Sequence, residues 1–223
     1  MKDLKKILAA CDHTLLSQDA TEKDILSLCH DAIKYGTASV CIPPCYVKAA
    51  SSFSNGRMKI CTVIGFPLGY QKTKVKVAET EEAVRDGADE IDMVINVGYL
   101  KDKRYKEILD EIKAVRCVCE GKILKVIIET CLLSDEEKKI MCSIVGEGGA
   151  DFIKTSTGFS YAGATAEDIK LFAENVPVGL KIKAAGGIKT LSDAELFLNL
   201  GAERLGTSRI VKIIKSEENI SGY

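Results

Sequence analysis

Several charged residues lie inside short apolar segments, where burial would normally exclude them. Asp92 lies in the segment EIDMVI, Lys125 in ILKVIIE, Lys154 in DFIKTST, and Lys181 and Lys183 in GLKIKA. A lysine in a low-dielectric interior beside a second cation loses proton affinity, because desolvation and like charge both disfavour the ammonium form. Such an amine can attack a carbonyl and form a Schiff base, while a neighbouring carboxylate moves the protons.

The alternation of side chains along a strand sorts these residues into faces. Lys181 and Lys183 share one face of their segment, and Asp92 shares a face with Glu90. If the apolar face meets covering helices, the charged face points into the interior of the sheet or barrel. The alternative is structural, because buried lysines also pair with carboxylates in inert networks and a lysine at a strand end extends to water. Lys154, Lys183 and Asp92 are the strongest functional candidates.

Glycine-rich joints after the late strands predict a second feature, an anion site. They are the stretches 155–159 (TSTGF), 185–189 (AGGIK) and 205–209 (LGTSR). Small residues let a ligand approach the exposed N–H groups at the following helix amino termini, which attract phosphate. Three such joints together predict a phosphorylated substrate. Ordinary turn glycines are the alternative for each joint taken alone.

The elements that must position these residues alternate between strand and helix throughout. Nearly continuous apolar runs, typical of parallel strands covered by helices, occur at 38–42, 59–65, 90–95, 123–129, 151–157, 179–184 and 204–208, with 11–14 as a short eighth. Eight units of about 28 residues fit the 223-residue chain. We therefore predict an α/β fold, a closed (βα)8 TIM barrel with short loops and an additional N-terminal helix, as a single domain over 1–223. An open doubly wound sheet shares this alternation.

Helix boundaries are marked by residue type. A hydroxyl residue three positions before an acid predicts a helix start, and it occurs at Thr21, Ser134, Thr165 and Ser192. A glycine that follows an amphipathic stretch and leads into a strand predicts a left-handed helix end, and it occurs at Gly87, Gly149 and Gly201.

Composition excludes several function classes. With 31 Lys+Arg against 32 Asp+Glu, the net charge of −1 favours neither nucleic acid nor an anionic membrane as partner. No apolar run reaches the roughly 18 residues of a membrane span, and the amino terminus does not resemble a signal peptide. The nine cysteines form no CxxC pair, so we expect no metal site and a reducing, cytoplasmic compartment. Buried thiols are expected at Cys41, Cys61, Cys117 and Cys142.

Six segments, in order and spread over nearly the whole chain, resemble the deoxyribose-phosphate aldolases, a family of class I aldolases. They are 12–16, 61–69, 90–98, 124–130, 152–158 and 183–188. The resemblance implies a (βα)8 barrel that reversibly cleaves 2-deoxy-D-ribose 5-phosphate into D-glyceraldehyde 3-phosphate and acetaldehyde, a step of deoxyribonucleoside catabolism. It implies neither a metal nor any other cofactor.

The resemblance also implies roles for individual residues. Lys154 occupies the Schiff-base position, Lys183 that of a second lysine that lowers the pKa of the first and relays protons, and Asp92 that of the acid/base partner. Asp12 and Lys125 match residues beside or behind the substrate. The residues implied to bind substrate and its phosphate are Thr157, Gly158, Phe159, Gly186, Gly187, Gly206, Thr207 and Ser208.

Three positions need separate mention. Tyr223 ends the chain, and its resemblance to the carboxy-terminal tyrosine of some members implies proton transfer in the active site, with a frayed terminus as the alternative. Pro44 stands where relatives often have Asn, and Arg209 where many have a second Ser. The expected partners are phosphosugar and aldehyde substrates. A homodimer or higher homo-oligomer is compatible with the sequence, which does not fix the oligomeric state.

Two rival functions make different demands on the sequence. A non-catalytic phosphosugar-binding barrel predicts the loss of a lysine or aspartate, whereas Asp92, Lys154 and Lys183 are all present. A different Schiff-base aldolase, such as a transaldolase-like protein, would lack this set of segments.

Overall fold

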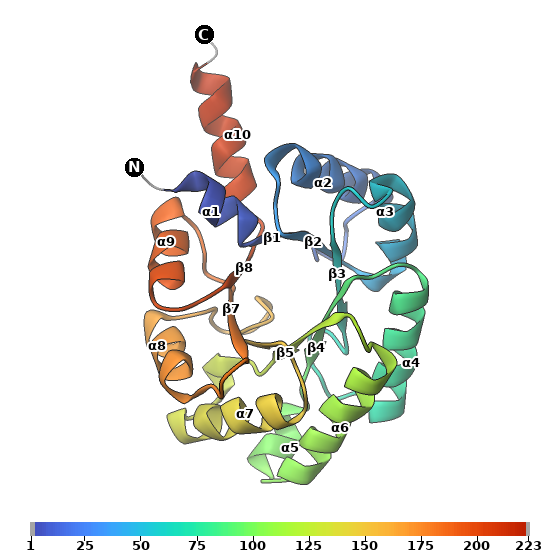
Figure 1. Ribbon diagram of the computed structural model, residues 1–223, viewed down its shortest axis with the longest axis vertical. Helices are drawn as coiled ribbons and strands as arrows, with labels where there is room; N and C mark the ends of the chain where they lie inside the picture. Colours follow the sequence, from blue (N-terminus) through green and yellow to red (C-terminus); the bar gives the residue numbers. More distant parts are fainter. Residues whose placement is uncertain (1–2, 222–223) are drawn as a thin grey trace.

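Eight parallel strands close into a barrel in the computed structural model, which describes residues 3–221 (Figure 1). The strands follow chain order, and the last pairs with the first, with Asp12 opposite Gly206. This pairing confirms the predicted closed barrel and rules out the open sheet. The strands are β1 (Cys11–Thr14), β2 (Ser39–Ile42), β3 (Ile60–Ile64), β4 (Glu90–Val94), β5 (Ile123–Ile127), β6 (Phe152–Lys154), β7 (Lys181–Ala185) and β8 (Arg204–Thr207).

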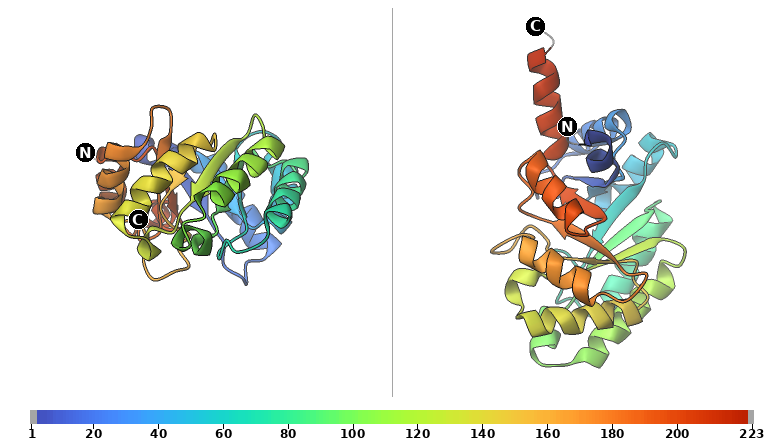
Figure 2. Two further views of the ribbon diagram at one scale, coloured as in Figure 1. Left: turned by 90° about the horizontal axis from the view of Figure 1, so that it is seen from below. Right: turned by 60° about the vertical axis from the view of Figure 1, so that its left-hand side comes forward.

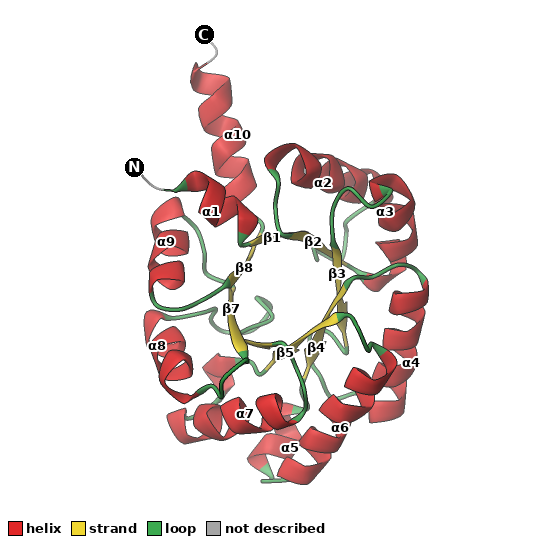
Figure 3. Ribbon diagram, in the orientation of Figure 1, coloured by secondary structure: helices red, strands yellow, loops and turns green. Residues whose placement is uncertain are grey.

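Helices form a ring outside the strands (Figure 3). The predicted additional helix is α1 (Leu4–Ala9), which precedes β1, while α10 projects beyond the barrel (Figure 2). The helices after β1 are α2 (Glu22–Tyr35), α3 (Val47–Ser54), α4 (Thr73–Arg85), α5 (Val97–Lys101), α6 (Tyr105–Val118), α7 (Asp135–Glu147), α8 (Ala166–Asn175), α9 (Leu191–Asn199) and α10 (Ile210–Ser221). Two 3₁₀ turns are η1 (Pro44–Tyr46) and η2 (Thr130–Leu132).

Most predicted helix boundaries are confirmed. A side chain that accepts a hydrogen bond from the N–H three residues later caps the helices after Thr21, Ser134 and Thr165. Positive φ angles of 108°, 77° and 111° confirm the left-handed ends at Gly87, Gly149 and Gly201. The start predicted at Ser192 is wrong, because Thr190 caps α9 and exchanges hydrogen bonds with Asp193. That reciprocal pair satisfies two helix-end N–H groups at once.

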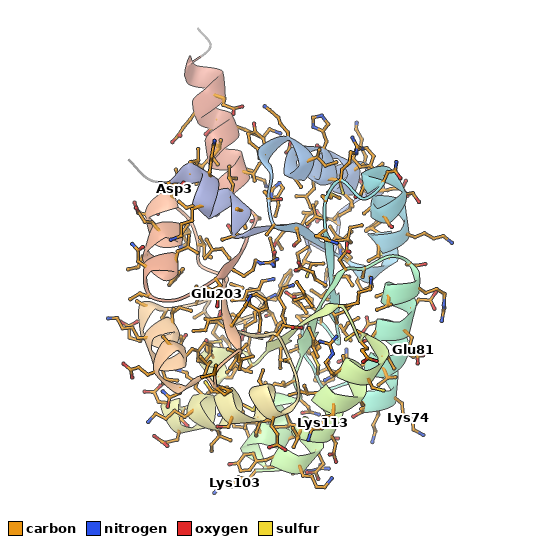
Figure 4. The ribbon with its side chains drawn as sticks, viewed as in Figure 1. Asp3, Lys74, Glu81, Lys103, Lys113 and Glu203 are labelled. Atoms are coloured by element: carbon orange, nitrogen blue, oxygen red, sulfur yellow. The ribbon has the colours of Figure 1, made fainter. Side chains whose placement is uncertain are left out.

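Buried side chains form one layer outside the strands and another inside the barrel. Ile91, Met93 and Val126 belong to the continuous apolar core between the strands and the helices. Alternate positions such as Asp92 and Lys125 are equally buried but contact each other and charged groups of other strands, so they point into the barrel. Lys74, Glu81 and Lys103, by contrast, are exposed at the periphery (Figure 4).

Three expectations from the pattern are wrong in detail. Cys117 is exposed on α6 rather than buried. The Lys181 side chain, at the first position of β7, is 52% exposed and lies 3.7 Å from Glu203, so it reaches water as strand-end lysines do. Strand β6 ends at Lys154, which places Thr155 and the residues after it in the loop that follows. No helix among the described residues combines the length and apolar character needed to cross a bilayer.

Candidate active site

The barrel register brings the candidate residues of β4 to β7 together. Asp92 pairs with Lys125 across β4 and β5, and Lys154 pairs with Lys183 across β6 and β7. Because directly opposite residues on neighbouring strands share a face, the two residues of each pair lie side by side. Asp92, Lys125 and Lys183 are fully buried, and Lys154 is nearly so.

Asp92 is the centre of this cluster. Its Oδ2 accepts hydrogen bonds from Lys154 Nζ at 2.7 Å and Lys183 Nζ at 2.6 Å, while its Oδ1 accepts from Lys125 Nζ at 2.8 Å. Burial alone would raise the pKa of Asp92, but the charges of Lys125, Lys154 and Lys183 outweigh it and hold that pKa well below its usual range. Asp92 is therefore an ionised carboxylate that binds two amines through one oxygen.

Asp12, on β1, lies beside the same group. Its Oδ2 accepts from Lys183 Nζ, and its Oδ1 accepts from Arg204 at 2.6 Å and from the Ser39 hydroxyl at 2.7 Å. Burial would lower the pKa of Lys183, but the carboxylates of Asp12 and Asp92 outweigh burial and raise it. Lys183 is thus held as an ammonium group beside Lys154.

Two members of the cluster were not predicted as site residues. Glu90 binds Lys125 at 2.6 Å and Arg204 at 2.9 Å, so it completes the lower part of the interior network. Glu90 shares a face with Asp92, which is a usable signal. Arg204 shares a face with Gly206, but nothing in the sequence indicates that its partners lie on β1 and β4.

Lys154 differs from the other interior lysines in two ways. Its Nζ forms an ion pair with Asp92 alone among the described carboxylates, whereas Lys125 and Lys183 each contact two or more. Its side chain retains 4% exposure, while theirs have none. The interior holds one cation more than its carboxylates: Lys125, Lys154, Lys183 and Arg204 face Asp12, Glu90 and Asp92. Lys154 is therefore the interior lysine with the fewest carboxylate partners.

The predicted anion-site residues all line one hollow of about 540 Å³ directly beyond Lys154. It is bounded by the loops after β6, β7 and β8, with the start of the loop after β1 opposite. Gly186 adopts a φ of 76° and packs against Gly163, since an added Cβ would lie 2.9 Å from the Gly163 Cα. A Cβ on Gly206 would lie 3.2 Å from Lys183 Cε, so this glycine lets the hollow approach the catalytic candidates.

Glu129, which the sequence did not single out, holds the first of these loops. It is buried, adopts a left-handed φ of 56°, and accepts from the Thr157 N–H at 3.3 Å and from its hydroxyl. The Thr157 hydroxyl in turn accepts from the Phe159 N–H at 3.1 Å. Burial raises the pKa of Glu129. A non-glycine residue in this conformation is uncommon and marks a constrained position.

An apolar wall faces the lysines from β2 and β3. Cys41, Cys61 and Val63 form a small buried cluster against which Leu16 and Phe66 pack. Next to it lies a second hollow, of about 290 Å³, lined mainly by apolar residues of the loops after β1, β2 and β3 and by Phe159, with Ser17, Gln18 and Glu79 also in its lining. Pro44 is among its lining residues, so the departure from the family pattern shapes this apolar wall.

The cluster also contains groups that could ligate a metal ion. Two buried triplets bring potential ligand atoms within 4.8 Å of one another, and they are Cys41, Cys61 and Asp92, and Asp12, Cys61 and Glu90. Each of these carboxylates is already paired with lysine or arginine. A divalent cation would meet several fixed positive charges at close range, so these donor sets do not suit one.

Lys181, a charged residue of the apolar segments that was a weaker candidate, lies outside the cluster. Lys181 is exposed at the opposite end of its strand from the glycine-rich loop. Tyr223 lies outside the described residues. A larger hollow of about 600 Å³, between α2 and α10, shares Thr14, Leu15, Ser17 and Lys212 with the first, but its lining contains three aspartates and does not suit an anion.

Comparison with known proteins gives concordant results. The deoxyribose-phosphate aldolase of Clostridioides difficile (strain 630) is 56% identical over 215 residues, covering 96% of this chain and 98% of that protein. The deoxyribose-phosphate aldolase of Streptococcus pyogenes serotype M4 is 54% identical over 215 residues, covering 96% of each.

Solved structures agree with the sequence relatives. A putative deoxyribose-phosphate aldolase from Coccidioides immitis superposes with a TM-score of 0.93 at 40% identity, covering 97% of this chain and 87% of that one. The tetrameric deoxyribose phosphate aldolase of Aeropyrum pernix superposes with a TM-score of 0.91 at 31% identity, covering 99% of this chain and 94% of that one. The sequence profile of the DeoC/LacD family aldolases matches residues 6–205, and the chain belongs to that family.

Proposed function

We propose that this chain is a deoxyribose-phosphate aldolase that reversibly cleaves 2-deoxy-D-ribose 5-phosphate into D-glyceraldehyde 3-phosphate and acetaldehyde through a Schiff base on Lys154. The observation that carries the proposal is the sharing of Asp92 Oδ2 by Lys154 and Lys183 at 2.7 and 2.6 Å. Two amines on one buried carboxylate oxygen give one nucleophile and one fixed cation beside it. The names of the close relatives agree with this activity.

Lys154 is the proposed nucleophile. Lys183, held charged by two carboxylates, disfavours a second ammonium group beside it, so the neutral Lys154 amine becomes accessible. The amine attacks the C1 aldehyde of the open-chain sugar, and loss of water from the carbinolamine gives an iminium ion. The positive nitrogen then acts as the electron sink for cleavage of the C2–C3 bond.

Asp92 and Lys183 are the proposed proton carriers. Removal of the C3 hydroxyl proton, through a bound water, drives C2–C3 cleavage, releases D-glyceraldehyde 3-phosphate and leaves the enamine of acetaldehyde on Lys154. Protonation of the enamine carbon and hydrolysis of the resulting iminium release acetaldehyde and restore the amine. The hydrogen bond between Lys183 and Asp92 lets a proton move from amine to carboxylate without a change in the total charge of this pair.

The remaining residues of the site have proposed supporting roles. The loops with Thr157 to Phe159, Gly186, Gly187 and Gly206 to Ser208 bind the phosphate, and the apolar wall at Cys41 and Val63 receives the two-carbon fragment. Asp12 contacts substrate and Lys183, and Lys125 fixes Asp92 from below. No metal or cofactor enters this scheme, because the lysine and arginine charges already neutralise the carboxylates.

The proposal extends to the whole protein. It treats residues 1–223 as one catalytic domain that acts in the cytoplasm on small phosphosugar and aldehyde substrates. Assembly into a homo-oligomer belongs to the proposal as well, and the related enzyme of Aeropyrum pernix is described as tetrameric.

Trapping with borohydride tests the chemistry directly. Incubation with acetaldehyde and sodium borohydride should reduce the iminium to a stable ethyl adduct, which peptide mass mapping should place on Lys154. The Lys154→Leu variant should carry no adduct in the same peptide. The exposed Lys181 serves as the internal control, since it lies on the neighbouring strand without the Asp92 contact.

The outcomes separate the rival functions. A wild-type protein that forms no adduct, although folded, would indicate the non-catalytic phosphosugar-binding barrel. An adduct on Lys181 or Lys183 would overturn the assignment of the nucleophile. An adduct on Lys154 without turnover of 2-deoxy-D-ribose 5-phosphate would favour a Schiff-base aldolase of another substrate.

A further inference from the structure

Three cationic side chains rim the hollow formed by the glycine-rich loops, and among the described residues none of them forms an ion pair. They are Lys189 after β7, Arg209 directly before α10 and Lys212 in the first turn of α10. No aspartate or glutamate of the described chain lines this hollow. The adjoining hollow between α2 and α10 contains Asp19, Asp24 and Asp31 instead. Lys212 lines both hollows, and only the hollow of the glycine-rich loops has cations in its lining without a carboxylate.

The missing ion pairs distinguish Arg209 and Lys212 from the next lysine of α10. Lys215 lies one turn further along α10 and pairs with Asp31 at 2.8 Å, and Lys34 pairs with Glu218 of the same helix at 3.0 Å. The other lysine of α10 is therefore neutralised by a carboxylate within the protein. The cations that line the hollow are left for an anion from outside.

Two hydrogen bonds hold the backbone of Arg209. Its N–H donates to the Thr207 hydroxyl at 3.1 Å, and its carbonyl accepts from the Ile213 N–H at 2.9 Å, which is the first hydrogen bond of α10. The backbone at the base of the side chain is therefore fixed at the helix start. The N–H groups of residues 210–212 precede that first bond and face the same end of the helix, which adds a favourable dipole for an anion.

The chemistry of the guanidinium identifies the group it would bind. A phosphate monoester carries a charge of about −1.5 to −2 at neutral pH. The planar guanidinium presents parallel N–H donors that match two phosphate oxygens, whereas an ammonium group acts as a point charge. One arginine fork with two flanking lysines suits the phosphate end of a substrate better than a neutral hydroxyl.

We propose that Arg209 is a specificity-determining residue that selects the phosphorylated aldehyde. The inference rests on the proposed function and assigns Arg209 to one of its two fragments. Acetaldehyde is uncharged and is carried on Lys154 in the interior, so it does not reach the rim. Only the three-carbon partner bears a phosphate, and Arg209 binds that group together with Lys189 and Lys212.

The test compares two substrates and two variants. Arg209→Gln keeps the length of the side chain and removes the charge, and it should lower kcat/KM for 2-deoxy-D-ribose 5-phosphate by about tenfold or more, through a higher KM. The loss for unphosphorylated 2-deoxy-D-ribose should be less than twofold. Arg209→Lys should recover part of the activity toward the phosphorylated sugar. Arg85→Gln, on the surface of α4, is the matched control and should behave as wild type.

Acetaldehyde trapping distinguishes failure of this inference from failure of the proposed function. Arg209→Gln should form the Lys154 adduct at the wild-type rate, because trapping involves no phosphate. Equal losses on both sugars, or no loss on either while trapping persists, would overturn the role of Arg209 and leave the Schiff-base proposal intact. Loss of trapping in the wild-type protein would overturn the proposed function itself.

Discussion

At the scale of single residues, the interior lysines differ through their neighbours rather than through their chemistry. The pKa of Lys125 and that of Lys183 are raised, because surrounding carboxylates outweigh the opposing effect of burial. Lys154 has one such partner and slight exposure. The same side chain can therefore serve as a fixed charge at two positions and as a nucleophile at the third.

Replacing Lys183 tests this division of roles. Lys183→Met removes the cation beside Lys154, so the ammonium form of Lys154 is no longer opposed by a like charge. The rate of acetaldehyde trapping at pH 7 should fall about tenfold or more and should recover partly at higher pH, where the amine is neutral without help. Lys181→Met changes the same residue type in the same strand, and its trapping rate should match wild type.

The pH profile is the decisive measurement for Lys183. A structural role alone would lower the amount of folded protein at every pH, without moving the pH dependence of trapping. If Lys183→Met traps acetaldehyde at the wild-type rate at pH 7, Lys183 is not the charge that activates Lys154.

The sequence predicted the central residues of this site, and two of its three omissions, Glu129 and Arg204, share one cause. Asp92, Lys154 and Lys183 stood out because charge inside an apolar strand is visible locally. Glu129 and Arg204 did not, because their importance depends on partners 28 and 192 residues away. The pairing of β5 with β6 brings Glu129 to Thr157, and the closure of β8 onto β1 brings Arg204 to Asp12.

At the scale of elements, strand β1 places different chemistry on its two faces. Asp12 points into the barrel and contacts Lys183, while the next residue, His13, points outward and lines the hollow between α2 and α10. His13 is 2% exposed, and its Nδ1 has no hydrogen-bond partner among the described residues. Burial lowers the pKa of His13 to about 4.

This lowered pKa predicts a specific loss of stability in acid. The unfolded chain binds a proton at His13 near pH 6.5, whereas the folded protein does so only near pH 4, so the folded state holds fewer protons between these values. Stability is therefore complete above about pH 6.5 and falls as the pH decreases toward 4, by about 3 kcal/mol from this group. Urea unfolding of wild type and His13→Gln between pH 7 and 4.5 should show a shallower decline in the variant.

The second histidine of the chain provides the control. His30 is exposed on α2, and His30→Gln should leave the pH dependence of unfolding unchanged. If wild type and His13→Gln lose the same free energy of unfolding over this range, burial of a neutral His13 does not account for the loss of stability in acid.

Strand and helix positions were more predictable than their ends. Apolar runs located the eight strands because each contributes outward residues to one continuous core. The end of β6 and the start of α9 were misplaced by two or three residues, since Thr155 and Thr190 have side chains that suit both strand and loop. The start of α9 is fixed by two hydrogen bonds that Thr190 and Asp193 exchange.

At the scale of the whole molecule, the charged interior also fastens the closure of the barrel. Arg204 on β8 binds Asp12 on β1 at 2.6 Å and Glu90 on β4 at 2.9 Å. The first of these contacts crosses the seam where the chain's last strand meets its first. The same carboxylate, Asp12, then contacts Lys183, so the seam and the proposed catalytic group share one network.

Removing Arg204 should therefore cost much more than removing a surface arginine. Arg204→Met leaves Glu90 and Asp12 buried with one cation fewer, and loss of one partner from a buried ion pair typically costs about 3–5 kcal/mol. Arg104→Met, which breaks an exposed pair with Glu107, should cost far less, because exposed ion pairs contribute little to stability. The double variant Arg204→Met with Glu90→Gln should regain part of the loss, because one uncompensated carboxylate is gone. Urea unfolding of the four proteins measures all three differences. If Arg204→Met is no more destabilising than Arg104→Met, the network does not fasten the barrel, and the interior charges serve the chemistry of Lys154 alone.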